Sequence, residues 1–256
     1  MQTELLVCAA TWMELRSWWP REDERAHLGE GELAYSPALT FTLTGIGVPA
    51  TLGRLFGLLQ DLRPARILNI GIAGAYPNSG LNIGDIVVGT SEVYGDVGFE
   101  LPDEPCFQSI KESPFIKQMP AAGQLYLDSL PMQFTADPDK PSGAEMADTR
   151  VSGTKIAEAN MADAAIGYRV LTVRGCTVST CTGTERTGLQ REKLFGVQFE
   201  SMEGAAVAQA GKQYGIPVSE IRAISNFAST RDMQPDNIRL AIANLRDYLH
   251  KTEQKI

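Results

Sequence analysis

Short apolar runs alternate with amphipathic stretches along most of the chain. The strand-like runs cover residues 5–10, 38–44, 67–71, 85–94, 170–180, 197–201 and 218–225. The helix-like stretches cover residues 49–62, 184–195, 203–214 and 235–249, and a shorter one passes through Leu15 and Trp18. Strands that alternate with helices are typical of α/β proteins. We therefore predict an α/β fold with a mixed, mostly parallel sheet that is flanked by helices.

The domain organisation predicted from this pattern is simple. The sequence has no internal repeat, no low-complexity tract and no segment with the composition of a linker. Residues 20–32 form a charged segment, which predicts a loop, and residues 100–165 show no clear periodicity. We expect residues 1–256 to form one domain, which is a common size for a single α/β domain.

The stretch from Val197 to Asp232 predicts strand, helix, strand and loop. Polar residues follow each of its two strands at the point where the strand ends. They are Ser201 and Glu203, on either side of Met202, after the first strand, and Ser225 and Asn226 after the second. In open α/β sheets, ligands bind at the carboxyl ends of the strands. We expect one carboxylate and one amide to face the same crevice.

Composition and charge narrow the possible partners. Hydrophobic residues make up 43% of the 256 residues, and the net charge is −8. An acidic protein lacks the basic surface that nucleic acid or an anionic membrane requires, so we expect neither as a partner. The hydropathy pattern predicts no transmembrane segment, and from residues 1–20 we expect no signal peptide. The four cysteines suggest no disulfide framework, which predicts a cytoplasmic protein.

Several familiar catalytic and binding motifs are missing. The chain has only two histidines, His27 and His250, and neither an HExxH nor a CxxC motif, so a Ser-His-Asp triad or a metal site is not predicted. The GxGxxA pattern at residues 45–50 lacks the acidic partner of a dinucleotide fingerprint and predicts a tight strand-to-helix turn instead. We therefore expect chemistry from carboxylates, amides, hydroxyls and backbone groups, without a metal or cofactor.

Several long motifs in a fixed order carry a family resemblance. They are NIGIAGA and GDIVVG, followed by TVSTCTGT, ESMEGAAVA and EIRAISN. With these motifs the chain resembles the purine nucleoside phosphorylase and nucleosidase superfamily over nearly its whole length, and within it the futalosine hydrolases. The resemblance implies a nucleoside phosphorylase-like fold, a homo-oligomer and a small-molecule nucleoside substrate. It implies hydrolysis of futalosine to hypoxanthine and dehypoxanthine futalosine, a step of menaquinone biosynthesis.

The resemblance also implies roles for residues around the sugar. Met202 would lie against the ribose, and Glu203 would accept hydrogen bonds from its hydroxyl groups. Glu14 matches the position of the catalytic carboxylate that holds and deprotonates water. Ala73 and Gly74 would leave room for the ribose. From the residues alone, Glu14 and Glu203 could equally be helix N-terminal carboxylates, which the helix dipole favours.

The residues around the base would decide substrate choice. Adenine-specific members of the superfamily carry Asp at the position of Asn226. An Asn amide can donate to a 6-oxo group and accept from N7–H, so Asn226 predicts hypoxanthine or guanine as the leaving base. Ser225 would orient the loop. Thr182 and Gly183, with Thr184, would border the base, although these threonines could instead cap the following helix.

The nucleophile and the rest of the substrate leave alternatives open. Ile72 stands where related phosphorylases often have a hydroxyl residue near phosphate, which favours water, although Arg54 could reach in. The alternatives are a phosphorylase of 6-oxopurine nucleosides, a methylthioadenosine-type nucleosidase, which Asn226 in place of Asp disfavours, and a silent nucleoside-binding protein. For the carboxyphenyl tail of futalosine, the sequence offers Tyr94, Phe99, Arg231 and residues of a second subunit.

Overall fold

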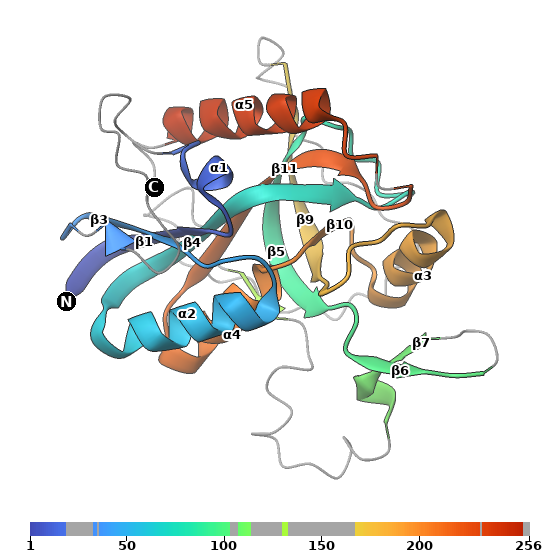
Figure 1. Cartoon of the computed structure of the whole chain (residues 1–256), viewed down its shortest axis with the longest axis horizontal. Coiled ribbons are helices and arrows are strands. Elements are labelled where there is room, and N and C mark those ends of the chain that lie inside the picture. The colour runs from blue at the N-terminus through green and yellow to red at the C-terminus, as the bar shows by residue number, and fades with distance from the viewer. Residues whose placement is uncertain are drawn as a thin grey trace.

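The architecture is described from a computed structural model (Figure 1), which describes residues 1–18, 33–34, 36–102, 107–113, 130–132, 167–230 and 232–252. The charged segment at 20–32, most of residues 100–165 and Arg231 lie outside the described residues. The predictions for these segments therefore stay predictions.

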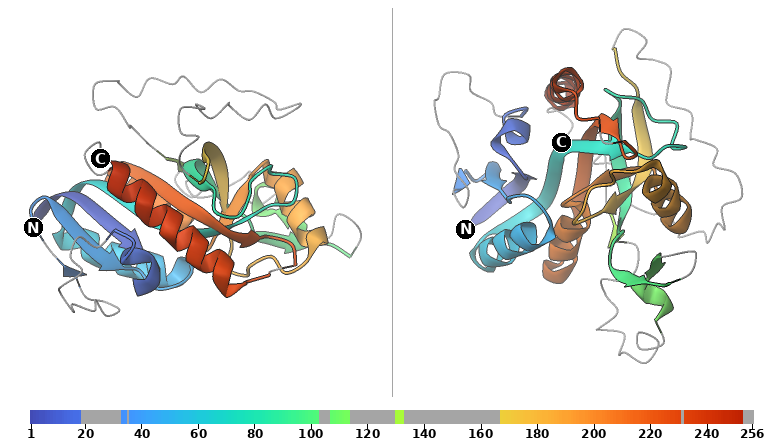
Figure 2. Two further views of the ribbon diagram at one scale, coloured as in Figure 1. Left: turned by 90° about the horizontal axis from the view of Figure 1, so that it is seen from above. Right: turned by 45° about the vertical axis from the view of Figure 1, so that its right-hand side comes forward.

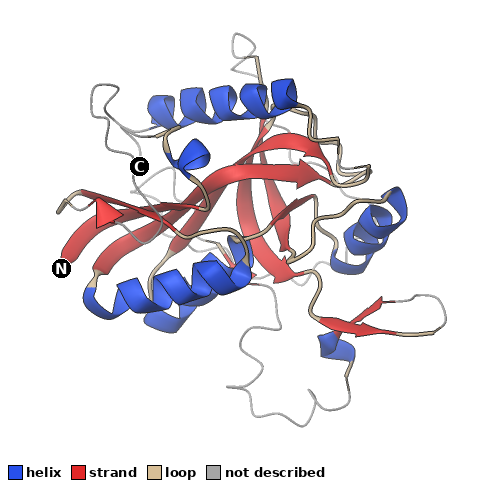
Figure 3. Cartoon of the chain, in the orientation of Figure 1, coloured by secondary structure: helices blue, strands red, loops and turns tan. Residues whose placement is uncertain are grey.

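One large sheet runs through the described part of the chain, and it is mixed, as the sequence predicts (Figure 3). Its strand order is β10-β9-β5-β11-β4-β1-β3-β2, and β8 pairs with β5. Five of its pairings are parallel and four are antiparallel. The strands are β1 (Gln2–Ala9), β2 (Leu33–Ala34), β3 (Leu39–Leu43), β4 (Arg63–Ala75), β5 (Ile86–Tyr94), β8 (Leu130–Pro131), β9 (Val170–Thr177), β10 (Phe199–Ser201) and β11 (Val218–Phe227).

Part of this sheet closes on itself, which the sequence pattern does not reveal. The short strand β10 pairs with β9 on one side and with the end of β4 on the other. Because β9, β5, β11 and β4 are already neighbours, β10 completes a ring of five strands. Apolar side chains from all five strands form one cluster, which includes Ala73, Val87, Leu171, Phe199 and Ile224.

Helices pack on both faces of the sheet (Figures 1 and 2). Leu15 of α1 and the buried residues of α5 share one core with β1, β3, β4 and β11. Residues of α2 and α4 share another core with β1 and β4 on the opposite face. The helices are α1 (Trp12–Leu15), α2 (Val48–Asp61), α3 (Glu185–Phe195), α4 (Gly204–Tyr214) and α5 (Pro235–Thr252).

A small hairpin lies apart from the main sheet. Strands β6 (Gly98–Glu100) and β7 (Phe107–Ser109) pair antiparallel and lead into a single 3₁₀ turn, η1 (Ile110–Glu112). The hairpin projects away from the sheet and the helices (Figure 2). Phe99, one of the residues considered for the substrate tail, therefore belongs to this projecting element.

Strand β4 is longer than predicted. The sequence predicts a strand over 67–71 and a glycine-rich loop after it, and the loop prediction is wrong, because β4 continues to Ala75. Its end is held on one side by β11 and on the other by β10. A strand with two neighbours can satisfy its backbone groups despite its glycines, which sequence propensity alone disfavours.

The turn between β3 and α2 follows the sequence prediction. Gly45 and Gly47 both have positive φ, at 76° and 85°, a conformation that side chains other than glycine rarely adopt. Pro49 lies in the first turn of α2, where it lacks only an N–H that the helix does not need. The GxGxxA pattern is thus a tight strand-to-helix turn.

Candidate active site

A cavity of about 220 Å³ opens where several chain segments meet beside the end of β4. Seven of the nine predicted site residues line it: Glu14, Ala73, Gly74, Met202, Glu203, Ser225 and Asn226. These residues come from α1, β4, the β10–α4 junction and β11, which are far apart in sequence. The structure therefore brings the early glutamate and the late asparagine to one hollow.

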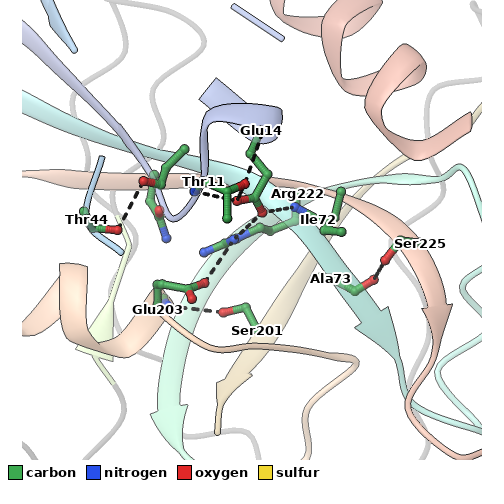
Figure 4. Close-up of polar contacts among 12 residues, drawn as sticks. Thr11, Glu14, Thr44, Ile72, Ala73, Ser201, Glu203, Arg222 and Ser225 are labelled. Atoms are coloured by element: carbon green, nitrogen blue, oxygen red, sulfur yellow. Dashed lines mark hydrogen bonds and ion pairs between the residues drawn. The ribbon is translucent and has the colours of Figure 1, made fainter. Parts of the chain in front are cut away.

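Glu14 is held by the start of its own short helix. Thr11 caps α1, and its backbone N and Oγ1 donate to Oε2 of Glu14 at 3.1 and 2.8 Å (Figure 4). This reciprocal arrangement is a capping box. The other oxygen, Oε1, accepts from the backbone N of Ile72 in β4 at 3.0 Å. The carboxylate, which is 5% exposed, thus bridges α1 and β4.

Ile72 therefore contributes its backbone to the site. Its N–H donates to Glu14, and this contact depends on an extended strand where a turn is predicted. Gly71, just before it, has no room for a side chain. A Cβ there would lie 2.4 Å from Nη1 of Arg222 and 2.5 Å from Oε1 of Glu14. The glycine is needed for close packing of these charged groups against β4.

Glu203 lies at the start of α4. Oε1 accepts from the backbone N of Gly47 at 3.0 Å, and Oε2 lies 3.5 Å from Nη1 of Arg222 (Figure 4). The pKa of Glu203 is raised, mainly because the carboxyl group is buried and also because Glu14 is near. Arg222 and the Gly47 N–H act in the opposite direction but do not cancel the shift. Glu203 is the N-cap residue of α4 and also lines the cavity. Both positions predicted for it, at a helix start and in the site, therefore occur together.

Arg222 is the main site residue that sequence reasoning missed. It is 1% exposed, and its Nη1 lies 3.5 Å from Glu203 and 4.0 Å from Glu14. Its Nε donates to Oε1 of Glu220 at 2.8 Å. Burial by itself would lower the pKa of Arg222, but the three carboxylates outweigh it and raise the pKa. The sequence does contain an indication of this residue: Glu220 and Arg222 are two positions apart in an apolar strand, which places both side chains on one face of the strand.

Ser225 lies at an irregularity in β11, and Asn226 follows it. The register with β4 shifts between Ile224 and Asn226, which marks a bulge. Oγ of Ser225 lies within hydrogen-bonding distance of the carbonyl of Ala73, at 3.3 Å, and of Oδ1 of Asn226, at 2.9 Å. Nδ2 of Asn226 donates to the carbonyl of Phe227 at 3.2 Å. Ser225 thus lies where it can orient the Asn226 amide.

Gly74 faces this amide from β4. A Cβ on Gly74 would lie 3.0 Å from Nδ2 of Asn226. A larger residue would therefore crowd the amide and reduce the cavity at that point.

Thr182 and Gly183 do not line the cavity. The backbone N and Oγ1 of Thr182 donate to the carboxylate of Glu200 at 2.8 and 2.6 Å, and Tyr76 OH donates to the same carboxylate at 3.1 Å. Gly183 is exposed. Thr184 caps α3, because its side chain accepts from the backbone N of Thr187. The helix-capping alternative for Thr184 is confirmed, and contacts of Thr182 and Gly183 with a base stay predictions.

The charged side chains that line the cavity are acidic, and they pair with arginines outside the lining: Glu14 and Glu203 with Arg222, and Glu200 with Arg191 at 3.5 Å. Among the described residues, the lining includes the three acidic residues Glu14, Glu200 and Glu203, and neither a lysine nor an arginine. Arg54, which could supply a cation, donates through Nε to Thr42 at 2.9 Å and does not line the cavity.

The apolar part of the wall differs from the residues considered for the substrate tail. Met13, Ile46 and Met233 line the cavity and are 37%, 61% and 39% exposed. Tyr94 does not line it and donates from its OH to Gln209, and Phe99 lines a separate cavity beside the β6–β7 hairpin. Met233, from the segment before α5, thus forms part of the apolar wall.

The described part of the chain offers no obvious metal site, since no group of three or more His, Cys, Asp or Glu side chains is arranged to hold an ion. Cys8 and Cys176 are buried free thiols, and Cys181 lines the cavity. Within the described ranges, no helix combines the length and apolarity needed to cross a membrane.

The fold and the cavity define the class of protein. Residues 37–252 match the family model of the phosphorylase superfamily, and the chain belongs to that superfamily. The resemblance inferred from the sequence motifs is therefore confirmed at this level. Over 61 residues the chain is 44% identical to a futalosine hydrolase of Streptomyces coelicolor, a match that covers 24% of this chain and 26% of the relative. The match thus spans about a quarter of that relative's length.

Solved structures share the fold over almost the whole chain. A 5'-methylthioadenosine/S-adenosylhomocysteine nucleosidase from Neisseria meningitidis has a TM-score of 0.68 at 18% identity, with 99% of this chain and 100% of that chain covered. A futalosine hydrolase mutant of Helicobacter pylori has a TM-score of 0.61 at 15% identity, with 99% of this chain and 100% of that chain covered. At these identities the similarity establishes the fold and leaves the substrate to be inferred.

Proposed function

We propose that this protein is a nucleosidase that hydrolyses the N-glycosidic bond of futalosine and releases hypoxanthine and dehypoxanthine futalosine. The observation that carries the proposal is one cavity lined by Glu14, Glu203 and Asn226, with acidic and no basic side chains among its described lining residues. The short match to a futalosine hydrolase supports the substrate.

The proposed reaction needs stabilisation at two ends of the breaking bond. Positive charge develops on the sugar and negative charge on the leaving base. Glu203 accepts hydrogen bonds from the ribose hydroxyls and, with Glu14, lies beside the sugar. Asn226 accepts from N7–H of hypoxanthine and donates to its 6-oxo group, a fixed dipole worth roughly a few kcal/mol in the transition state.

Water attacks the anomeric carbon as the base leaves. N7 of the leaving base takes a proton from solvent as the C–N bond breaks, and Glu14 is the general base that takes a proton from the attacking water and later returns it to solvent, so that the overall reaction consumes one water. Its hydrogen bonds from Thr11 and Ile72 fix its orientation without requiring the substrate. Arg222 lies outside the cavity lining, next to both Glu14 and Glu203, and its positive charge offsets part of the repulsion between the two carboxylates.

The charge of the cavity favours water over phosphate as the nucleophile. A phosphate dianion would face three glutamates without a lysine or arginine among the described lining residues. Moving such a dianion out of water without a cation is costly. The phosphorylase alternative is therefore the weaker one.

The exposed apolar residues at the cavity suit the tail of the substrate. Met13, Ile46 and Met233 offer an apolar wall to the phenyl ring of futalosine. We also propose that the protein works in the cytoplasm and, as the family resemblance implies, forms a homo-oligomer.

The test is product analysis with four substrates, each with and without phosphate. Futalosine, aminodeoxyfutalosine, inosine and methylthioadenosine are incubated with the purified protein, and released bases are separated by liquid chromatography. We expect hypoxanthine from futalosine at the same rate with and without phosphate, together with free dehypoxanthine futalosine. A strict requirement for phosphate would make the protein a phosphorylase. Faster release of adenine from methylthioadenosine would overturn the assignment of Asn226.

A further inference from the structure

Behind the cavity, three polar atoms are buried without a hydrogen-bond partner among the described residues. They are Oε1 of Glu92, Oε2 of Glu220 and Nη2 of Arg222. Glu92 and Glu220 are fully buried, and Arg222 is 1% exposed. An unpaired buried polar group is costly, and an unpaired buried carboxylate is more costly still. A second layer of charged groups thus lies behind the proposed catalytic residues.

The carboxyl groups of Glu92 and Glu220 both lie next to Gly204, the first residue of α4. A Cβ on Gly204 would lie 2.6 Å from Cδ of Glu92 and 2.7 Å from Oε1 of Glu220. Because Gly204 has no side chain, the two carboxyl groups can approach each other there. Oε1 of Glu92 would lie 2.8 Å from the same Cβ, so the two carboxyl groups flank one point beside Gly204.

Each carboxyl group has one satisfied oxygen and one orphaned oxygen. Thr177 Oγ1 donates to Oε2 of Glu92 at 2.7 Å. Asn69 Nδ2 and Arg222 Nε donate to Oε1 of Glu220 at 3.1 and 2.8 Å. No donor of the described chain reaches the remaining two oxygens. A proton retained on Glu92 would make this group a hydrogen-bond donor beside Glu220.

The charges of the cluster favour the same arrangement. Three carboxyl groups, those of Glu14, Glu203 and Glu220, lie within 4.0 Å of the buried guanidinium of Arg222, and a fourth, that of Glu92, lies beside Glu220. Burial raises the pKa of Glu92 well above its ordinary value, and the neighbouring Glu220 raises it further, although Thr177 and Arg222 act in the opposite direction. Retaining one proton removes one of four negative charges from a dry region.

We propose that Glu92 and Glu220 share one proton and that this carboxyl pair is a positioning device for Arg222. The pair fixes Glu220, and Glu220 fixes Nε of the planar guanidinium. Nη1 is thereby held 3.5 Å from Glu203 and 4.0 Å from Glu14. The existence of the pair is independent of the proposed function, and its effect on turnover rests on that function.

The first test is infrared spectroscopy of the free protein near neutral pH. A shared proton gives a protonated-carboxyl C=O band in the wild-type protein. We expect this band to be lost in Glu92→Gln and retained in Glu185→Gln, which changes an exposed glutamate in the first turn of α3. Absence of the band from the wild type, or its persistence in Glu92→Gln, would overturn the proposal.

The second test compares an apolar and an amide replacement of Glu92 in turnover of futalosine. Glu92→Leu removes the donor, so we expect kcat to fall at least about tenfold, because Glu220 then keeps an unpaired oxygen. Glu92→Gln supplies an N–H in place of the shared proton and is expected to restore kcat to within about threefold of wild type. Equal kcat values in Glu92→Leu and Glu92→Gln would refute the positioning role.

The two tests separate failure of the positioning role from failure of the proposed function. If the wild-type protein does not cleave futalosine, the proposed function fails, and the infrared comparison still decides whether the proton is shared. If Glu92→Leu does not fold, the infrared test and a Glu220→Gln variant remain. Glu220→Gln removes the charge that holds Nε of Arg222 and is expected to lower kcat at least about tenfold, and unchanged kcat would refute the role.

Discussion

Nη1 of Arg222 lies 3.5 Å from Oε2 of Glu203, which joins the middle of β11 to the start of α4. The same nitrogen lies 4.0 Å from Oε1 of Glu14, in the short helix after β1. One buried cation therefore stands behind two carboxylates that we assign to different tasks. A change in any of the three groups is expected to alter the other two, because their charges interact in a region with little water.

Replacement of Glu14 by glutamine is expected to abolish most of the turnover and leave the fold intact. The amide would keep an oxygen that can accept a hydrogen bond from Thr11 or Ile72, but it could not take a proton from water. We expect kcat for futalosine to fall by about 10²–10⁴ and the free energy of unfolding to change by about 1 kcal/mol or less. Hypoxanthine release and urea unfolding measure the two effects.

The control for this change is Glu4→Gln, which removes an exposed carboxylate on β1. It is expected to have wild-type kcat. Turnover by Glu14→Gln within tenfold of this control would remove Glu14 from the mechanism.

Substitution of Asn226 by aspartate is expected to change which base is released. A protonated Asp donates to N7 and accepts from a 6-amino group, whereas the Asn amide donates to a 6-oxo group. We expect the ratio of kcat/KM for futalosine over aminodeoxyfutalosine to fall at least about tenfold, since a mispaired buried group costs about 1–3 kcal/mol. Parallel assays of the two substrates give the ratio.

A suitable comparison for this variant is Asn237→Asp, in the first turn of α5 and away from the cavity. It makes the same chemical change without touching the base. If Asn226→Asp and Asn237→Asp gave the same substrate ratio, Asn226 would not select the base.

The pKa of Glu203 predicts a dependence of stability on pH. Because burial raises this pKa, with Arg222 opposing the shift, the folded protein keeps a proton at pH values where the unfolded chain has lost it. Stability is therefore present in full below the unfolded pKa of about 4.3 and falls as pH rises towards the folded pKa. The slope from this one group reaches at most about 1.4 kcal/mol per pH unit.

Urea unfolding at a series of pH values tests this dependence. In Glu203→Gln the fall in stability is expected to be smaller than in the wild type, and Glu185→Gln is expected to retain it. A steeper fall in Glu203→Gln than in the wild type would contradict the upward shift.

Gly71→Ala is expected to disturb the site through packing alone. The added Cβ would lie 2.4 Å from Nη1 of Arg222 and 2.5 Å from Oε1 of Glu14, so at least one charged group must move. We expect a loss of about 1–3 kcal/mol in the free energy of unfolding and a fall in kcat of at least about tenfold. Thermal or urea unfolding and the futalosine assay measure both.

Gly57→Ala provides the matched change. Gly57 lies in α2, and a Cβ there would meet nothing within 4 Å. Because alanine favours helix, this variant is expected to be as stable as the wild type or more stable by up to about 1 kcal/mol. Similar destabilisation of both variants would argue against a special requirement at Gly71.

The sequence alone determined the α/β class and the approximate place of most helices and strands. Hydrophobic periodicity is a local property, and so are capping signals such as Thr184 before α3 and Pro49 in α2. The motif order also indicated the superfamily, and with it residues that later proved to line one cavity. These features could be predicted because each depends on neighbours within a few positions or on a linear motif.

Only the tertiary structure decided how the charged residues meet. The closure of the ring by β10 and the extension of β4 to Ala75 depend on pairing between distant strands. The contacts of Arg222 with Glu203, Glu14 and Glu220 depend on the same pairing, as does the approach of Glu92 to Glu220. The sequence lists these residues at separations of up to about two hundred positions. Their interaction energies depend on distance and burial in space, and neither quantity can be read from linear order.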